Sequence, residues 1–248
     1  MPLEQSRTLL YKLLGKEYAK PNPDQLKAVD EICRFVDGHP LAIIFASNLI
    51  RRCMMSFQQA SQTLEKSRQL LVEWKADCGE TDATLAATLE ASISRLPKPA
   101  LHMLQIMAFL DPDRIEESFL RGVQVPGGTI EDYSSYMVVL SNLSDHSLIS
   151  RHGSRFWIHR IVQDVVIQLM DPESRLTTFS TDVDAIWAAF PEQTNGLLMS
   201  SVLDICDSCS PHVEALERRY KEYFEMGDGH TSRETVLHFA QVLYTCSW

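Results

Sequence analysis

The residues that could carry chemistry are few, and they are spread along the chain. Cys206 and Cys209 form a Cys-x-x-Cys pair, the spacing of thiol redox sites and of half a zinc site. A redox pair is expected at a helix start after a strand, and a structural zinc site needs a second pair. The sequence shows neither context, so a chance spacing is the favoured interpretation and no metal site is predicted.

Two histidines need the same test. Asp145-His146-Ser147 contains the residue types of a hydrolase triad, but adjacent residues cannot converge on a substrate, and no Gly-x-Ser-x-Gly elbow is present. His159 stands at a predicted strand-to-helix junction, where an exposed or capping histidine without a ligand is the ordinary case. The sequence therefore predicts no catalytic residue.

The chain also lacks the machinery of a nucleotide-hydrolysing site. There is no phosphate loop of the form Gly-x-x-x-x-Gly-Lys-Ser/Thr, whose backbone amides and lysine hold the β- and γ-phosphates. We find no apolar strand ending in paired acids that could hold magnesium. We expect that this chain alone does not hydrolyse ATP and is not an enzyme.

The composition is that of a folded, acidic protein. The 248 residues are 45% hydrophobic and carry a formal net charge of -10, which is unlike the basic face of most nucleic-acid binders. No apolar run reaches the roughly 18 residues of a membrane span, and the N-terminus does not resemble a signal peptide. We expect a cytoplasmic protein whose six cysteines are reduced thiols.

The first 75 residues predict a bundle of four helices. A leucine stripe over residues 9–14 marks the first helix, which Gly15 ends. Asp24 is the predicted cap of the second helix, and Gly38 ends it.

The third helix should start at Pro40, a favoured first-turn residue. Its run 41–46 is apolar nearly all round, which predicts the buried centre of the bundle. Ser56 and Gln59 predict a capping box for the fourth helix, and a polar linker follows it.

The middle of the chain predicts helices followed by a β-hairpin. Thr81 or Asp82 can cap the first of these helices, and Pro97-Lys98-Pro99 breaks the chain after it. The helical segments are expected at 82–96, 101–110, 115–120, 136–143 and 161–169. Before the last of them, two short apolar runs flank Gly153, which is a hairpin signal. This is the order of elements in a winged-helix domain.

From residue 171 onward the pattern is helical throughout. One apolar face is formed by Phe179, Val183, Ile186, Trp187 and Phe190, and 197–206 and 213–224 are two further candidate helices. A last helix is expected over 235–244. The predicted fold class is therefore mainly α: a small helical bundle, a winged-helix domain with a short β-hairpin, and a helical, repeat-like tail.

Three segments, in order, resemble the part of NB-ARC proteins that follows the ATPase core. Residues 38–42 (GHPLA) resemble the Gly-Leu-Pro-Leu-Ala motif of the small helical subdomain. Residues 101–120 (LHMLQIMAFLDPDRIEESFL) resemble the opening of the winged-helix subdomain in fungal members with tetratricopeptide repeats, and residues 148–166 (LISRHGSRFWIHRIVQDVV) resemble its end. Within the latter, residues 158–160 (IHR) stand where the family has a Met-His-Asp-like motif. The final helix resembles the start of a first tetratricopeptide repeat, which would be truncated.

The resemblance implies a fragment of a fungal STAND, NOD-like receptor-like signalling protein. Its implied domains are a helical bundle at 1–75, a winged helix at 80–172, and a helical region at 173–248 leading into a tetratricopeptide-like repeat.

The resemblance also implies a place for nucleotide in a complete protein. Pro40 would pack near the adenine of ADP or ATP, and His159 would face the ADP β-phosphate and hold the inactive state. His39 replaces the usual leucine of the first motif, and Arg160 replaces the aspartate of plant members. Pro40 is also explained simply as a helix-starting proline. We assign no cofactor to this chain alone, and ADP or ATP is a possible ligand in a complete protein.

The function expected is that of a regulatory and protein-interaction module. Its partners would be a nucleotide-binding domain, from a missing half or a separate chain, and other proteins held by the C-terminal helices. Two alternatives stay open: a winged-helix DNA-binding regulator, and a truncated gene fragment without independent activity. Residues 131–170 carry three arginines, no lysine and four acids, which is the wrong balance for DNA. We therefore expect neither nucleic acid nor membrane as a partner.

Overall fold

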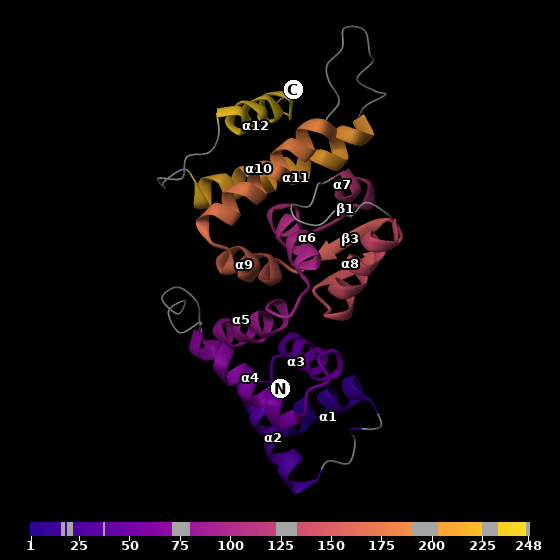
Figure 1. The fold of residues 1–248 in the computed structure, drawn as a ribbon, viewed down its shortest axis with the longest axis vertical. Helices are drawn as coiled ribbons and strands as arrows, with labels where there is room; N and C mark the ends of the chain where they lie inside the picture. Colours follow the sequence, from indigo (N-terminus) through magenta and orange to yellow (C-terminus); the bar gives the residue numbers. More distant parts are fainter. Residues whose placement is uncertain are drawn as a thin grey trace. The chain divides into compact units, whose positions relative to one another are not determined.

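The computed structural model is mainly helical, with one small antiparallel sheet (Figure 1). This confirms the predicted fold class of a mainly α protein with a short hairpin. The structure describes residues 1–15, 18, 22–36, 38–70, 80–122, 133–189, 203–224 and 233–246. Two compact units divide the chain: residues 1–97 with 141–148, and residues 98–140 with 149–248.

The first unit is a helical bundle centred on α3. Its helices are α1 (Leu3–Leu14), α2 (Pro23–Phe35), α3 (Pro40–Arg52), α4 (Phe57–Leu70) and α5 (Glu80–Ile93). Helix α3 packs against α1, α4 and α5, while α2 packs against α1 and α4. Phe45, Leu49 and Ile50 of α3 are fully buried. The predicted apolar centre of the bundle is thereby confirmed.

The helix ends of this unit follow local signals, with one correction. Helix α1 ends at Gly15, which adopts φ +101°, a conformation that favours glycine. Helix α2 is capped by Asn22 and not by Asp24 as predicted. The Asn22 side chain accepts from the Gln25 amide at 2.8 Å, and the Gln25 side chain accepts from the Asn22 amide at 2.9 Å. Pro23 occupies the first helical position, so the helix starts earlier than an Asp24 cap would allow.

The predicted capping box of α4 is confirmed. The Gln59 amide donates to the Ser56 hydroxyl at 3.2 Å, and the Ser56 amide donates to the Gln59 side chain at 2.9 Å. These two bonds satisfy donors that the first turn of a helix leaves free.

Helix α5 starts earlier than its predicted caps. It begins at Glu80, so Thr81 and Asp82 already lie inside it. The sequence prediction assigned this helix to the second domain, whereas it belongs to the first compact unit and packs on α3 and α4. Its described face is apolar and buried, including Leu85 and Leu89, and it needs the apolar surface of the bundle to cover it. The domain boundaries 1–75, 80–172 and 173–248, which the family resemblance implied, stay predictions.

The second unit combines a small sheet with several helices. Its elements are α6 (Lys98–Phe109), β1 (Ile115–Glu116), α7 (Glu117–Gly122), most of α8 (Tyr133–Asp145), β2 (Ile149–His152), β3 (Arg155–Ile158), α9 (Arg160–Leu169), α10 (Pro172–Ala189), α11 (Leu203–Tyr223) and α12 (Arg233–Cys246). Helix α6 packs against α9, α10 and α11. Its Met103, Ile106 and Phe109 are fully buried, which makes α6 the centre of this unit.

The predicted hairpin is present, and it gains a third strand. Strands β2 and β3 pair antiparallel, and Gly153 takes φ +63° in the turn between them. The sheet order is β1-β3-β2, with Ile115 opposite Phe156. The sequence predicted a helix over 115–120, but its first two residues form β1. A strand of two residues carries no periodic signal, and its pairing partner lies about 40 residues away along the chain, so only the folded sheet reveals it.

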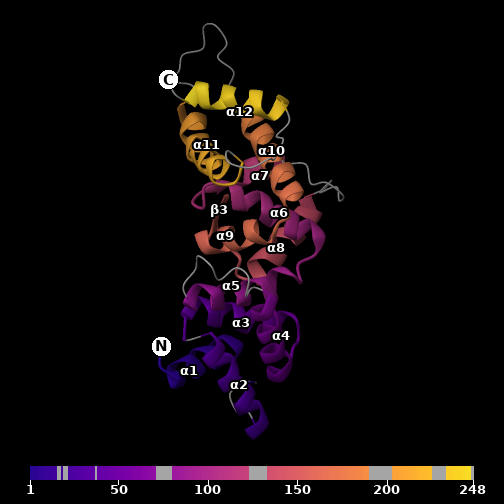
Figure 2. The ribbon, with the colours of Figure 1, turned by 90° about the vertical axis from the view of Figure 1, so that its left-hand side faces the viewer.

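The C-terminal helices pack on one another and on α6. Helix α10 contacts α6, α11 and α12, and α12 runs across α10 and α11 (Figure 2). The sequence predicted separate helices over 197–206 and 213–224, whereas α11 is continuous from residue 203 through Pro211. A proline inside a helix removes one backbone hydrogen bond. Burial of Val213 and Leu216 on one face of α11 offsets that loss.

The last helix lies where it was predicted, since α12 contains residues 235–244. Phe190 and residues 197–202 of the predicted helical tail fall outside the described residues. Within the described part of the chain, no helix combines the length and apolar character needed to cross a membrane.

Candidate functional site

His159 lies between the sheet and α9. It directly follows β3, is exposed, and serves as the N-cap of α9. The ring atom Nδ1 accepts a hydrogen bond from the Ile161 amide at 3.3 Å. We therefore assign the proton of the neutral ring to Nε2. His159 is thus the exposed, capping histidine that the sequence allowed. Its Nε2–H donor is left over at the N-terminus of α9, the positive end of the helix dipole, where anions are favoured.

A buried glutamine holds α9 in place behind His159. Gln163 lies one turn into α9 and is only 1% exposed. Its Nε2 donates to the carbonyl oxygens of Met107 at 3.0 Å and Leu110 at 2.8 Å, at the end of α6. These carbonyls belong to the last turn of α6 and its continuation, where a helix leaves acceptors unpaired. The side chain of Gln163, on α9, thus caps the C-terminal end of α6.

Two further contacts fix the same corner. The Asp111 amide donates to Nδ1 of His212 on α11 at 3.1 Å, and the Ile158 amide donates to the Pro112 carbonyl at 3.0 Å. Burial lowers the pKa of His212 to about 4, so the ring is a neutral acceptor near pH 7. The loop after α6 is therefore held by α11 and by the end of β3, directly before His159.

The arginines of the hairpin are paired with acids of the neighbouring elements. Arg151 contacts Glu117 at 2.7 Å, and Arg155 contacts Glu116 at 2.7 Å. Glu117 also pairs with Arg121 at 2.6 Å. The positive charge of the hairpin is therefore largely neutralised within the unit.

Pro40 lies in the other unit. It is exposed and occupies the first position of α3, as predicted. The preceding turn needs glycine, because Gly38 has φ +64° and a Cβ atom there would lie 2.3 Å from the Met1 carbonyl oxygen. Pro40 and His159 belong to different units. Their shared role at one nucleotide stays a prediction.

The cysteine pair lies within a helix, with Cys209 buried. Cys206 and Cys209 are free thiols, both on α11. Burial raises the pKa of Cys209 above its usual value, which disfavours the thiolate needed for redox chemistry or metal binding. Within the described ranges, no group of histidines, cysteines and acids is arranged to hold a metal ion.

The residues of the rejected triad diverge. Asp145 pairs with Arg52 at 2.6 Å, and Ser147 accepts from Asn48 at 2.9 Å. His146 is buried, and burial lowers its pKa. Each residue has a packing or pairing role of its own, and they do not converge.

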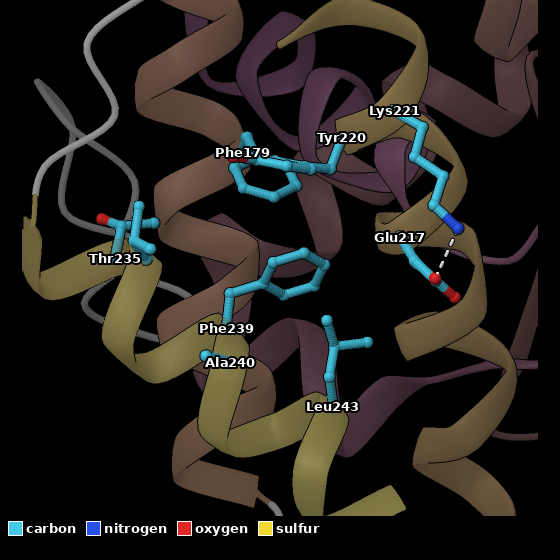
Figure 3. A pocket seen from close by; sticks show the side chains of 9 residues that line it. Phe179, Glu217, Tyr220, Lys221, Thr235, Phe239, Ala240 and Leu243 are labelled. Carbon is cyan, nitrogen blue, oxygen red and sulfur yellow. Dashed lines mark hydrogen bonds and ion pairs between the residues drawn. The ribbon is translucent and has the colours of Figure 1, made fainter. Parts of the chain in front are cut away.

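A small apolar pocket lies between α10, α11 and α12 (Figure 3). Its volume is about 240 Å³, and it is lined by Phe179, Glu217, Tyr220, Lys221, Thr235, Val236, Phe239, Ala240 and Leu243. The ring of Phe239 lies 5.4 Å from that of Phe179 and 5.6 Å from that of Tyr220. On the α11 side, Lys221 and Glu217 form an ion pair at 2.6 Å.

The pocket can accept an apolar side chain beside a polar edge. Large aromatic surfaces with a polar group nearby are typical of protein contact sites. The sequence predicted a helix over 235–244, but it did not indicate a pocket, because a helix prediction alone does not say which neighbouring side chains leave space.

Residues 91–175 match a domain of unknown function, DUF7779. The match covers less than half of the chain, from the last residues of α5 into α10, and so includes the sheet and His159. No curated protein gives a significant match to the chain.

Proposed function

We propose that this chain is a regulatory and protein-interaction module of an NB-ARC-type signal-transduction ATPase. The observation that carries the proposal is the place of His159. It stands in the segment that resembles the family's Met-His-Asp-like motif, at an exposed helix start, with Nδ1 engaged and the Nε2 donor left over. A neutral donor at a helix N-terminus suits the β-phosphate of ADP.

In this proposal the chain senses a nucleotide that another domain binds. The chain has no phosphate loop, so a nucleotide-binding domain, in the same protein or a separate chain, supplies the cradle for the phosphates. His159 adds a contact to the ADP-bound state, and differential contact with two nucleotide states is what shifts a conformational equilibrium. Gln163 fixes the start of α9 against α6, so His159 at that start is held in one position for the contact.

The C-terminal helices would hold a protein partner. Val236 and Leu237 of α12 are 43% and 53% exposed, and Tyr244 is 65% exposed. Together with the pocket, they give α12 an apolar outer surface of the kind that marks an interaction site. The gene-fragment alternative predicts the same bare surface, and it differs in predicting no nucleotide-dependent behaviour.

The DNA-binding alternative is weakened by the charges of the hairpin. A DNA-contacting wing needs free basic groups to neutralise phosphates. Arg151 and Arg155 are each paired with a carboxylate, so a phosphate would have to compete with Glu116 and Glu117 for them.

The experiment is a calorimetric titration of the whole chain with ADP and with AMP, which lacks the β-phosphate. Without the cradle of a nucleotide-binding domain the chain should bind nucleotide weakly, but ADP should still bind more tightly than AMP, because only ADP offers His159 a β-phosphate. A hydrogen bond to a charged group contributes about 1.5–3 kcal/mol, so His159→Ala should weaken ADP binding about 10- to 100-fold and leave AMP binding unchanged.

Two variants distinguish a contact between His159 and the β-phosphate from the role of His159 as the N-cap of α9. His159→Asn keeps a good N-cap acceptor for the Ile161 amide but has a shorter side chain, so it should lose ADP selectivity without unfolding α9. His152→Ala removes another exposed histidine of the same sheet and should bind as the wild type does. Equal binding of ADP and AMP, or ADP binding that survives His159→Ala, would overturn the proposed role of His159.

A further inference from the structure

The carboxyl group of Asp182 lies inside the second unit without a hydrogen-bond partner. The residue has 0% exposed surface, and neither carboxyl oxygen receives a donor. A buried polar group without a partner costs free energy, and a buried unpaired charge costs much more. Asp182 must therefore sit in the folded unit as the neutral acid.

Asp182 lies on the face of α10 that joins the C-terminal helices to α6. Its neighbours along this face, Phe179, Val183 and Ile186, are fully or almost fully buried. The ring of Phe179 lies 6.3 Å from that of Phe109 on α6 and 5.4 Å from that of Phe239 on α12. An apolar residue at 182 would suit this face better than an acid does.

No described charge compensates the carboxyl group. Burial alone raises the pKa of Asp182 well above its usual value, without any contribution from a charged neighbour. Helix α10 packs against α6, α7, α11 and α12. Several ionisable side chains on these helices are engaged in other pairs: Glu117 with Arg121 on α7, Glu217 with Lys221 and Arg219 with Glu222 on α11, and His238 of α12 with Asp184 of α10. On α11, burial lowers the pKa of His212 to about 4, which disfavours its charged form. On α6, burial lowers the pKa of His102, which disfavours its charged form.

We propose that Asp182 makes α10 a proton-dependent latch. With the carboxyl protonated, α10 stays seated on α6 and holds α11 and α12 beside it. Loss of the proton places a charge in an apolar environment, and the unit relieves this by opening α10 toward water. The pocket that Phe179 helps to line would open with it. This inference does not rest on the proposed role of His159.

The sign of the pH dependence follows from proton counting. Once α10 opens, Asp182 returns to water and its pKa falls to the ordinary value near 4. Between that value and the raised folded-state pKa, the closed state holds one proton more than the open state. The opening equilibrium constant therefore rises about tenfold for each pH unit and levels off above the folded-state pKa.

The test is hydrogen exchange of the α10 amides in the whole chain, from pH 5 to pH 8, corrected for intrinsic exchange rates. His212 titrates with the opposite sign, so the quantity to follow is the ratio of wild-type opening to that of Asp182→Asn at each pH. We expect this ratio to rise about tenfold per unit at the acidic end of the range.

Asp182→Leu provides a second reference in case the asparagine variant does not fold, and it should show the same rising ratio. The matched control is Asp184→Asn, two residues along the same helix, where the carboxylate is 58% exposed and pairs with His238 at 2.8 Å. It should keep the wild-type pH dependence. A ratio that stays flat across the range with both Asp182 variants would overturn the latch.

Discussion

Replacing Gln163 with leucine should destabilise the second unit by about 2–4 kcal/mol. Leucine has a similar size, but it removes two hydrogen bonds to the end of α6, each worth about 0.5–1.5 kcal/mol. It also leaves the carbonyls of Met107 and Leu110 facing a buried apolar group, at about 1–3 kcal/mol for a carbonyl that finds no other donor. The gain in apolar burial, and the removal of the Gln163 Oε1 atom, which is buried without a hydrogen-bond partner, offset part of this sum.

Urea unfolding followed by circular dichroism measures the effect. With a slope of about 2 kcal/mol per molar urea, the middle of the usual range, the midpoint should fall by about 1–2 M. Gln168→Leu is the matched control on the same helix, because Gln168 is exposed and makes a single long contact of 3.5 Å with Tyr223. We expect the control to change stability by less than about 0.5 kcal/mol. A change that small for Gln163→Leu would refute the idea that this residue fastens α9 to α6.

The remaining predictions concern a buried histidine and a helix cap. The pKa of His212 is about 4 in the folded chain and near its ordinary 6.5 when unfolded, so the contribution of His212 to stability should fall by up to about 1.4 kcal/mol per unit as the pH drops through this window, opposite in sign to that of Asp182. His212→Gln, which can still accept from Asp111, should lose this slope in urea titrations at pH 7, 6 and 5, and an unchanged slope would assign it to other groups. Asn22→Ala should cost about 1 kcal/mol, since it removes the cap of α2. Asp24→Ala should cost less in the same unfolding assay, and the reverse order would restore Asp24 as the functional cap.

The features predicted correctly from the sequence depend on neighbouring residues. Pro40 starts α3, Ser56 and Gln59 form a box, and Gly153 turns the hairpin. Each of these signals acts within a few residues, so the local sequence contains it completely. The exposed, capping state of His159 was also among the predicted possibilities for the same reason.

The features that were missed depend on partners distant in sequence. Strand β1 exists because Ile115 meets Phe156, and α11 runs through Pro211 because its face is buried by tertiary contacts. Gln163 reads as an ordinary polar helix residue until its two acceptors are known to lie more than 50 residues away. Asp182 likewise lies among the apolar residues of the predicted helix face, and nothing in the local sequence distinguishes it from the exposed Asp184 two residues further on. The pocket required the relative placement of three helices.

The most direct test of the central claim is a nitrogen-15 NMR titration of the histidine side chains, with assignment by single substitution. The account predicts that the Nε2 nitrogen signal of His159 shifts when ADP is added and not when AMP is added, while the signals of His152 stay in place. Equal shifts with both nucleotides, or none with ADP at millimolar concentration, would contradict a contact between His159 and the β-phosphate.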